Sequence, residues 1–192
     1  LYGSSSMGGT VRYITNAPDL AHVRGKIHVE GSVTDNGGPN ENVDGVVNIP
    51  LVDDRLALRV TAYQRYDTGY IDRYRIDPAN YLAVDPSGPV KREVNNYATQ
   101  GFRAVLLYQP DSTFSVTPSL YYQNVRLGGP FQIDVPPGGL DRLIQTRDTS
   151  ENTEQRSIVA NLSIHKTIPY FELVSSTSYF DREVTIHEDV SK

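Results

Sequence analysis

Strict alternation of apolar and polar residues is the feature that most constrains how this chain folds. From Val23 to Val33 every second residue is Val, Ile or Gly, and the residues between them are Arg, Lys, His, Glu and Ser. Because successive side chains of a strand point to opposite faces, this pattern predicts a strand with one apolar and one polar face. The chain is therefore expected to be all-β.

Similar segments recur along the chain and predict an antiparallel meander of about seven long strands. The predicted strands are Val23–Val33, Asn42–Ile49, Arg55–Tyr66, Asn95–Tyr108, Phe114–Gln123, Arg156–Lys166 and Phe171–Val184. In the last of them the alternation is less regular, and the sequence does not indicate which face is apolar. A further short strand is expected at Thr10–Thr15, before the meander begins.

The connections between these strands alternate strictly in length. The short turns are Pro50–Asp54, Gln109–Thr113 and Thr167–Tyr170, whereas Thr68–Glu93 and Arg126–Thr153 are long. In a meander this places the short turns at one end of the sheet and the long loops at the other, as in outer-membrane β-barrels. Tyr and Phe gather near the strand ends, which fits either an interfacial girdle or the general preference of aromatic residues for strands.

Composition excludes several classes of protein. The mean hydropathy is −0.42 and no window approaches the roughly 18 consecutive apolar residues of a membrane helix, so a helical membrane protein is excluded. A net charge of −5 without a dense basic run makes nucleic acid an unsuitable partner. The chain has no cysteine, which removes disulfides, zinc thiolates and thiol nucleophiles.

The sequence contains no complete motif for catalysis, for cofactor binding or for metal binding. Gly3 and Gly8 have the spacing of a phosphate-binding loop, but Gly9 occupies the lysine position and a strand rather than a helix is expected next. The four histidines lack the spacing of metal ligands, and the acidic pair Asp53–Asp54 is explained by a turn. We therefore predict no catalytic residue, no cofactor and no metal site, and a protein that is not an enzyme.

The N-terminal segment carries a more specific pattern, L-Y-G, four residues, G-G, a short strand and T-x-x-P. Its residues are Leu1, Tyr2, Gly3, Gly8, Gly9, Thr15 and Pro18. This pattern resembles the plug-to-barrel junction of TonB-dependent outer-membrane receptors, and Val47–Leu51 with Leu56–Arg59 is similar to the same family around its first periplasmic turn. The resemblance implies that residues 1–18 end a plug domain. Residues 19–192 would then be the N-terminal portion of a transmembrane β-barrel of roughly 22 strands, in a chain cut at both ends.

The resemblance also implies a function and a location. The parent protein would be an active-transport receptor of the bacterial cell outer membrane that takes up a scarce solute, such as an iron–siderophore complex, with energy from the TonB complex. Its partners would be outer-membrane lipid, a small-molecule ligand such as a metal chelate, and the TonB complex, reached through an N-terminal region outside this chain. The loops Thr68–Glu93 and Arg126–Thr153 would help to form the capture surface.

Three polar-face residues are expected to line the lumen of such a barrel. Arg59 and Arg103 alternate with apolar neighbours, as does Tyr63, and an arginine facing lipid near the bilayer midplane destabilises a barrel by about 2–4 kcal/mol. They are expected to contact a plug, or an anionic ligand as the alternative.

Two other classes of protein share the strand pattern. A soluble β-sandwich carbohydrate-binding module has equally natural alternation and long loops. A passive porin or adhesin barrel has the same strands and lacks only the plug junction.

Overall fold

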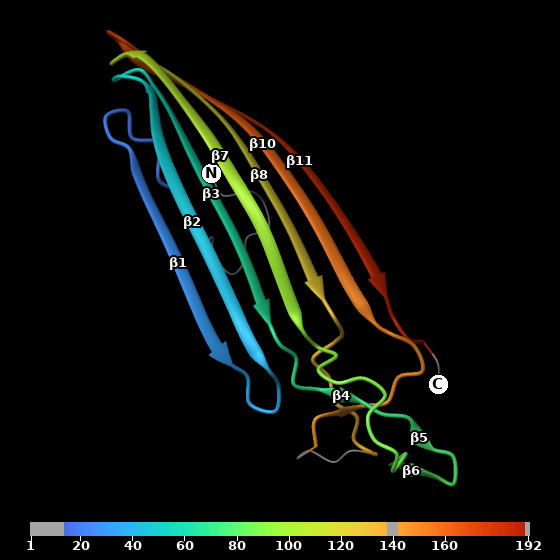
Figure 1. The fold of residues 1–192 in the computed structure, drawn as a ribbon. Coiled ribbons are helices and arrows are strands. Elements are labelled where there is room, and N and C mark those ends of the chain that lie inside the picture. The colour runs from blue at the N-terminus through green and yellow to red at the C-terminus, as the bar shows by residue number, and fades with distance from the viewer. Residues whose placement is uncertain (1–13, 138–141, 191–192) are drawn as a thin grey trace.

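Seven long strands form one antiparallel sheet in a computed structural model that describes residues 14–137 and 142–190 (Figure 1). The order of the strands in the sheet is β1-β2-β3-β7-β8-β10-β11, so each long strand lies beside its neighbours in the meander. Their bounds are β1 (Arg24–Val33), β2 (Pro39–Val52), β3 (Leu56–Asp67), β7 (Tyr97–Asp111), β8 (Phe114–Leu127), β10 (Asn152–Ile168) and β11 (Phe171–His187). The predicted all-β meander is confirmed.

Several strands continue further toward the long loops than their side chains indicate. β2 begins at Pro39 rather than Asn42, which shortens the preceding loop, and β8 ends at Leu127 rather than Gln123. Backbone pairing with the adjacent strand fixes these extensions. Residues 39–41 carry no alternation, and in residues 124–127 the alternation is inverted, because Val125 lies on the face opposite to Leu120. β2 also continues past Pro50 to Val52, with an irregularity in register between these residues, so the turn predicted at Pro50–Asp54 occupies residues 53–55.

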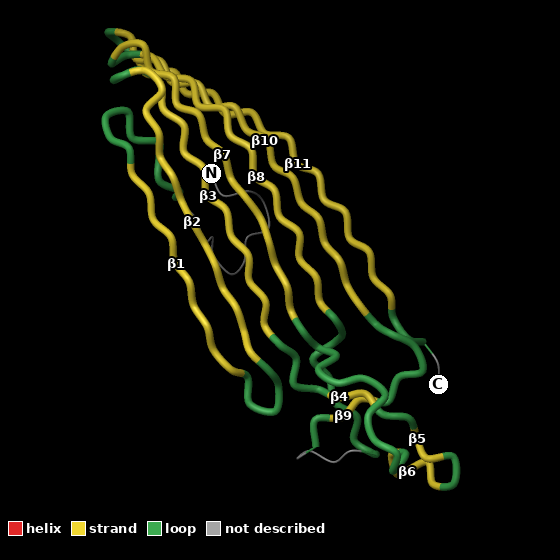
Figure 2. The backbone as a smooth tube through the Cα atoms, in the orientation of Figure 1, coloured by secondary structure: helices red, strands yellow, loops and turns green. Residues whose placement is uncertain are grey.

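The short turns and the long loops lie at opposite ends of the sheet, as the alternating lengths predict (Figures 1 and 2). The turns after β2, β7 and β10 share one end. The long connections after β3 and β8 share the other, together with the brief β1–β2 connection. Antiparallel pairing of every long strand enforces this separation.

The register divides the sheet into an apolar and a polar face. Residues directly paired across strands point to the same face, and Val47, Val60, Ala104, Leu120 and Ala160 form one continuous apolar row across β2 to β10. We call this side the apolar face and the opposite side the polar face.

The register also shows which residues of β11 lie on each face of the sheet, which the sequence alone did not indicate. Tyr179 pairs with Ala160, so it lies on the apolar face together with Asp181 and Glu183. Phe180 and Val184 lie on the polar face. The polarity of this strand is therefore partly inverted relative to the other six.

Neither face of the sheet is covered by a second layer among the residues that the structure describes. The edge strands β1 and β11 each pair with one neighbour, so the sheet is open and no barrel closure is shown. Ile27 on the apolar face is 79% exposed. No helix within residues 14–137 and 142–190 is long and apolar enough to cross a membrane.

Candidate functional site

The two long loops fold together at one end of the sheet (Figure 2). The first contains β4 (Asp72–Arg73), β5 (Ile76–Asp77) and β6 (Asn80–Val84), and the second contains β9 (Ile144–Gln145). β4 and β9 pair in parallel, which joins segments far apart in the sequence. We call residues 68–96 together with 128–137 and 142–151 the loop cap.

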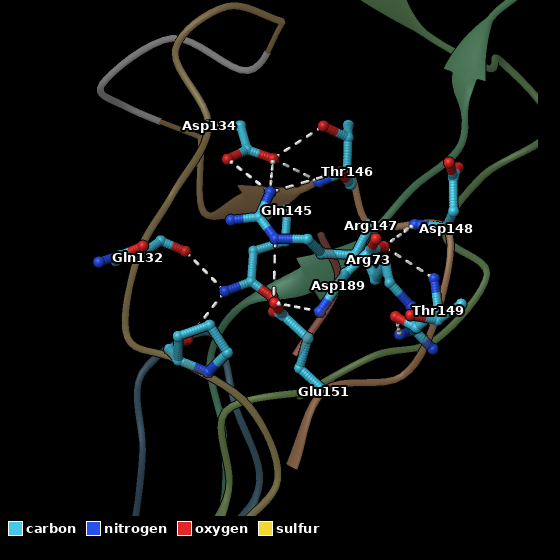
Figure 3. Close-up of polar contacts among 11 residues, drawn as sticks. Arg73, Gln132, Asp134, Gln145, Thr146, Arg147, Asp148, Thr149, Glu151 and Asp189 are labelled. Atoms are coloured by element: carbon cyan, nitrogen blue, oxygen red, sulfur yellow. Dashed lines mark hydrogen bonds and ion pairs between the residues drawn. The ribbon is translucent and has the colours of Figure 1, made fainter. Parts of the chain in front are cut away.

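The loop cap has a small core of its own. The side chains of Ile71, Val94 and Ile144 are almost fully buried in it. Gln145 is also buried, and its Nε2 donates to the carbonyl oxygens of Pro130 at 2.8 Å and Gln132 at 2.7 Å (Figure 3). A buried amide that donates two hydrogen bonds to backbone carbonyls fixes the path of the loop around it.

A second buried amide holds the first loop. Asn95 Oδ1 accepts hydrogen bonds from the backbone N–H groups of Tyr70 and Ile71, each at 2.8 Å. Its Nδ2 is buried without a hydrogen-bond partner within the described part of the chain. A Cβ at Gly69 would lie 2.5 Å from the carbonyl oxygen of Glu93, so only glycine fits where the two ends of this loop meet.

An ionic network stiffens the second loop (Figure 3). The Asp134 carboxylate accepts from Thr146 N at 2.6 Å, Thr146 Oγ1 at 2.7 Å and Arg147 Nη1 at 2.9 Å. Arg147 Nε lies 3.3 Å from Glu151 Oε2 on its other side. Burial alone raises the pKa of Asp134, but the hydrogen bonds from Thr146 and Arg147 outweigh burial and leave this pKa below its ordinary value.

The same network ties the loop cap to the end of β11. Asp189 Oδ2 accepts from the backbone N–H groups of Asp148 at 2.5 Å and Thr149 at 2.9 Å. The backbone N–H of Asp189 in turn donates to Glu151 Oε1 at 3.1 Å. The loop is therefore held at both its own base and the neighbouring strand end.

Two hollows lie beneath the loop cap and share one aromatic side chain. A cleft of about 440 Å³ runs between the second loop and the strand ends, lined in part by Phe131, Ile186 and His187. A smaller hollow of about 260 Å³ is lined in part by Asn95, Tyr97 and the same Phe131. Phe131 is 56% exposed. Only the cleft of about 440 Å³ falls within the roughly 300–1,000 Å³ of typical small-molecule pockets.

The three residues predicted to line a lumen lie together on the polar face. Tyr63 OH is 3.1 Å from Tyr121 OH and accepts from Gln123 Nε2 at 2.9 Å. Arg59 and Arg103 lie on neighbouring rows of β3 and β7. Their assignment to a lumen stays a prediction.

Most of the predicted plug-to-barrel motif lies outside the described residues, including Leu1, Tyr2, Gly3, Gly8 and Gly9. Ile14 and Thr15 are described and are not in a strand, contrary to the expectation for Thr10–Thr15.

The segment Pro18–His22 packs on the polar face. Pro18 is buried, Asp19 N donates to Asn48 Oδ1 at 2.8 Å, and Asn48 Nδ2 donates to the carbonyl oxygens of Asp19 and His22 at 2.9 Å each. The backbone leading into β1 is therefore fixed against β2.

Sequence reasoning missed the residues that organise the loop cap. Asp134, Arg147 and Asn95 stand outside the strands, and Gln145 stands in the two-residue strand β9, which is too short for periodicity to give information. The one available signal was the length of the loops, since long connections in a compact chain are usually folded or functional. Among residues 14–137 and 142–190, no group of three or more His, Asp or Glu is arranged to hold a metal ion.

Comparisons with protein-family models, curated proteins and solved structures gave no match to this chain.

Proposed function

We propose that this chain is part of a bacterial outer-membrane receptor for active solute uptake, with the apolar face turned to lipid and the polar face to the lumen. The observation that carries the proposal is the exposed apolar band on one face of the sheet. Soluble monomers rarely expose apolar patches larger than a few hundred Å². A face of this kind is natural where hydrocarbon is the solvent.

The band has the layout expected for a lipid-facing surface. From β2 to β10 its central rows are mainly aliphatic and aromatic, including the contacting rings of Phe102 and Tyr122, whose centroids are 5.8 Å apart. On the edge strand β11 the same face carries Asp181. Toward the long loops the same face becomes polar, in the row of Gln64, Gln100, Asn124 and Arg156. This change along the strands fits a boundary between hydrocarbon and the polar interface.

The loop cap supports a receptor rather than a bare channel. It brings its own core and ionic network, so its hollows are preformed on a rigid base, as binding loops commonly are. The segment Pro18–His22, held on the polar face, favours a barrel with polypeptide in its lumen over a passive porin or adhesin. We further propose that uptake draws energy from the TonB complex and that the ligand is a scarce solute such as a metal chelate.

The competing sandwich module needs a second sheet over the apolar face. No such layer is present among residues 14–137 and 142–190. This favours the membrane proposal, since a sandwich core is made by two apposed apolar faces.

Expression of the full-length protein in a Gram-negative cell tests the proposal. We expect it in the outer-membrane fraction, with heat-dependent migration in SDS gels. Deleting its gene should slow growth under iron limitation to the same extent as removing the energy-coupling complex. A protein found in the soluble fraction would support the sandwich, and uptake that persists without energy coupling would support a passive barrel.

A further inference from the structure

The two hollows beneath the loop cap follow a single row of residues on the polar face of the sheet. Members of this row pair in succession from β3 to β11, in the order Asp67, Tyr97, Leu127, Thr153 and Ile186. The first two line the hollow of about 260 Å³, and the last three line the cleft of about 440 Å³. Phe131 of the second loop lines both, so the hollows adjoin at its ring. We call the two hollows together the loop-cap track.

The shape of the loop-cap track suits a ligand made of linked units. One unit would lie against Asp67 and Tyr97, and the next against Leu127 and Ile186, with the ring of Phe131 in contact with both. Each hollow has room for at least one six-membered ring. A compact, globular solute would fill one hollow and leave the other empty, so it would use only part of this surface.

The charges along the track disfavour an anionic ligand. Among the described residues of its lining, Arg147 is the one lysine or arginine. The acidic residues of the same lining are Asp67, Glu151, Glu188 and Asp189. The Arg147 guanidinium is also engaged on two sides, 2.9 Å from Asp134 and 3.3 Å from Glu151 (Figure 3). A ligand carboxylate or phosphate would therefore meet an excess of negative charge, without an unpaired arginine or lysine among the described lining residues.

A cationic ligand is not required either, because most of these carboxylates are engaged. Asp67 Oδ2 accepts from Arg65 Nε at 2.8 Å, and Glu151 Oε2 lies 3.3 Å from Arg147 Nε. Asp189 Oδ2 accepts from two backbone N–H groups of the second loop. Carboxylate oxygens in such pairs retain lone pairs that accept hydrogen bonds from hydroxyl groups. The polar part of the lining therefore suits an uncharged ligand that is rich in hydroxyls.

Aromatic side chains supply much of the remaining surface. Tyr70, Tyr97 and Phe131 line the track, and Phe131 is 56% exposed. An aromatic ring presents a flat face of negative potential. The C–H face of a sugar ring is flat, apolar and slightly positive, so it packs well on such a ring while its hydroxyls reach polar groups at the side. Linked units, the lack of charge, hydroxyl donors and flat apolar faces together describe an oligosaccharide.

We propose that the loop-cap track binds an uncharged oligosaccharide, with neighbouring sugar units on either side of Phe131. The inference rests on the proposed function in that the loop cap must be the ligand-binding part of the receptor. The oligosaccharide is either the whole solute or a part attached to a metal chelate, and the chemistry that the track recognises is the same in both.

Binding of the purified full-length protein to a glycan array tests the class of ligand. The array holds short uncharged oligosaccharides of different linkages, together with matched ones in which a single unit is a uronic acid. We expect binding to at least one uncharged oligosaccharide. Titration calorimetry should then give an affinity about tenfold or more lower for its acidic counterpart, because the lining carboxylates repel the added charge.

Substitution of Phe131 tests the place of binding. Phe131→Ala should lower the affinity for the bound oligosaccharide by about tenfold or more, because both sugar units lose their contact with the ring. Val135→Ala is the matched control, since Val135 lies in the same loop and is 51% exposed but lines neither hollow. Its affinity should be unchanged.

Growth of a strain that lacks the gene distinguishes the two sources of the oligosaccharide. A defect with the bound oligosaccharide as the carbon source identifies it as the whole solute. A defect under iron limitation alone identifies it as part of a chelate.

The outcomes separate this inference from the proposed function. Absence of binding to every uncharged glycan, tighter binding of the acidic ones, or an equal loss of affinity in Phe131→Ala and Val135→Ala would overturn the inference. Each of these results leaves location in the outer membrane and energy coupling intact. A protein that binds the oligosaccharide but is found in the soluble fraction would contradict the proposed function instead.

Discussion

The loop cap and the sheet are stabilised in different ways. In the loop cap, Ile71, Val94 and Ile144 are buried by neighbouring loop residues, and buried amides such as Asn95 and Gln145 fix the backbone. In the sheet, Ala57 and Val105 are the buried apolar residues within the described ranges, and the apolar face is exposed. The loop cap therefore carries its own core, whereas the apolar face of the sheet has no covering layer among residues 14–137 and 142–190.

The largest expected effect comes from the core of the loop cap. Ile71→Ala removes a side chain with 0% exposure, and such a truncation destabilises by about 2–5 kcal/mol. Hydrogen exchange in the full-length protein should show lost protection across residues 68–96, 128–137 and 142–151, with the long strands unchanged. Ile76→Ala, in the same loop but 42% exposed, should have little effect. Loss of protection throughout β3 and β7 would contradict an independent loop cap.

A slightly smaller effect is expected from a charge placed on the apolar face. Leu162→Arg should destabilise the full-length protein in lipid vesicles by about 2–4 kcal/mol, because the guanidinium would face hydrocarbon. Ser163→Arg, the next residue on the polar face of β10, should change the free energy of unfolding much less. Denaturant titration of both variants measures the difference. Equal effects at the two positions would contradict the assignment of the faces.

A smaller effect on the free energy of unfolding is expected from glycine-to-alanine substitutions, and it should differ between the two faces of the sheet. A Cβ at Gly101 on the polar face would lie 2.5 Å from Tyr122 O and 2.7 Å from Tyr63 OH, so Gly101→Ala should destabilise by about 1–3 kcal/mol. At Gly45 on the apolar face the nearest atom is 3.7 Å away, and Gly45→Ala should be nearly neutral. The same unfolding titration compares them. A neutral Gly101→Ala would show that Tyr63 does not rest over the backbone.

The smallest expected effect is the response of the loop cap to acid. The pKa of Asp134 is lower in the folded state than in the unfolded state. Its contribution to the stability of the second loop is therefore fully present above the ordinary carboxyl pKa of about 3.9, and it is lost as the pH falls through the lower folded-state pKa. Proteolysis of the second loop should therefore increase only in strong acid. In Asp134→Asn the loop should be more susceptible at neutral pH and less sensitive to acid. An Asp134→Asn loop with unchanged pH dependence would assign the acid response to another carboxylate.

Sequence patterns predicted the sheet far better than the loop cap, for a physical reason. When each face of a strand meets a different environment, apolar and polar residues must alternate along it. Strands such as β3 and β10 can therefore be predicted from their own residues alone. The loop cap depends on contacts between distant segments, such as the backbone hydrogen bond from Asp72 N to Leu143 O at 2.9 Å. Local periodicity does not encode such contacts. β11 was ambiguous because its polarity is partly inverted, which became evident only from its pairing with β10.

Spin-label accessibility along β10 tests the central claim most directly. The 192 residues contain no cysteine, so single cysteines can be placed at positions 158 to 165 without removing a native one from this chain. In lipid vesicles, the labels at 158, 160, 162 and 164 should be accessible to oxygen, which concentrates in hydrocarbon, and protected from a water-soluble nickel complex. The labels at 159, 161, 163 and 165 should show the lower oxygen accessibility of a face turned away from lipid. Accessibility to oxygen that does not alternate with a period of two would contradict an apolar face in contact with lipid.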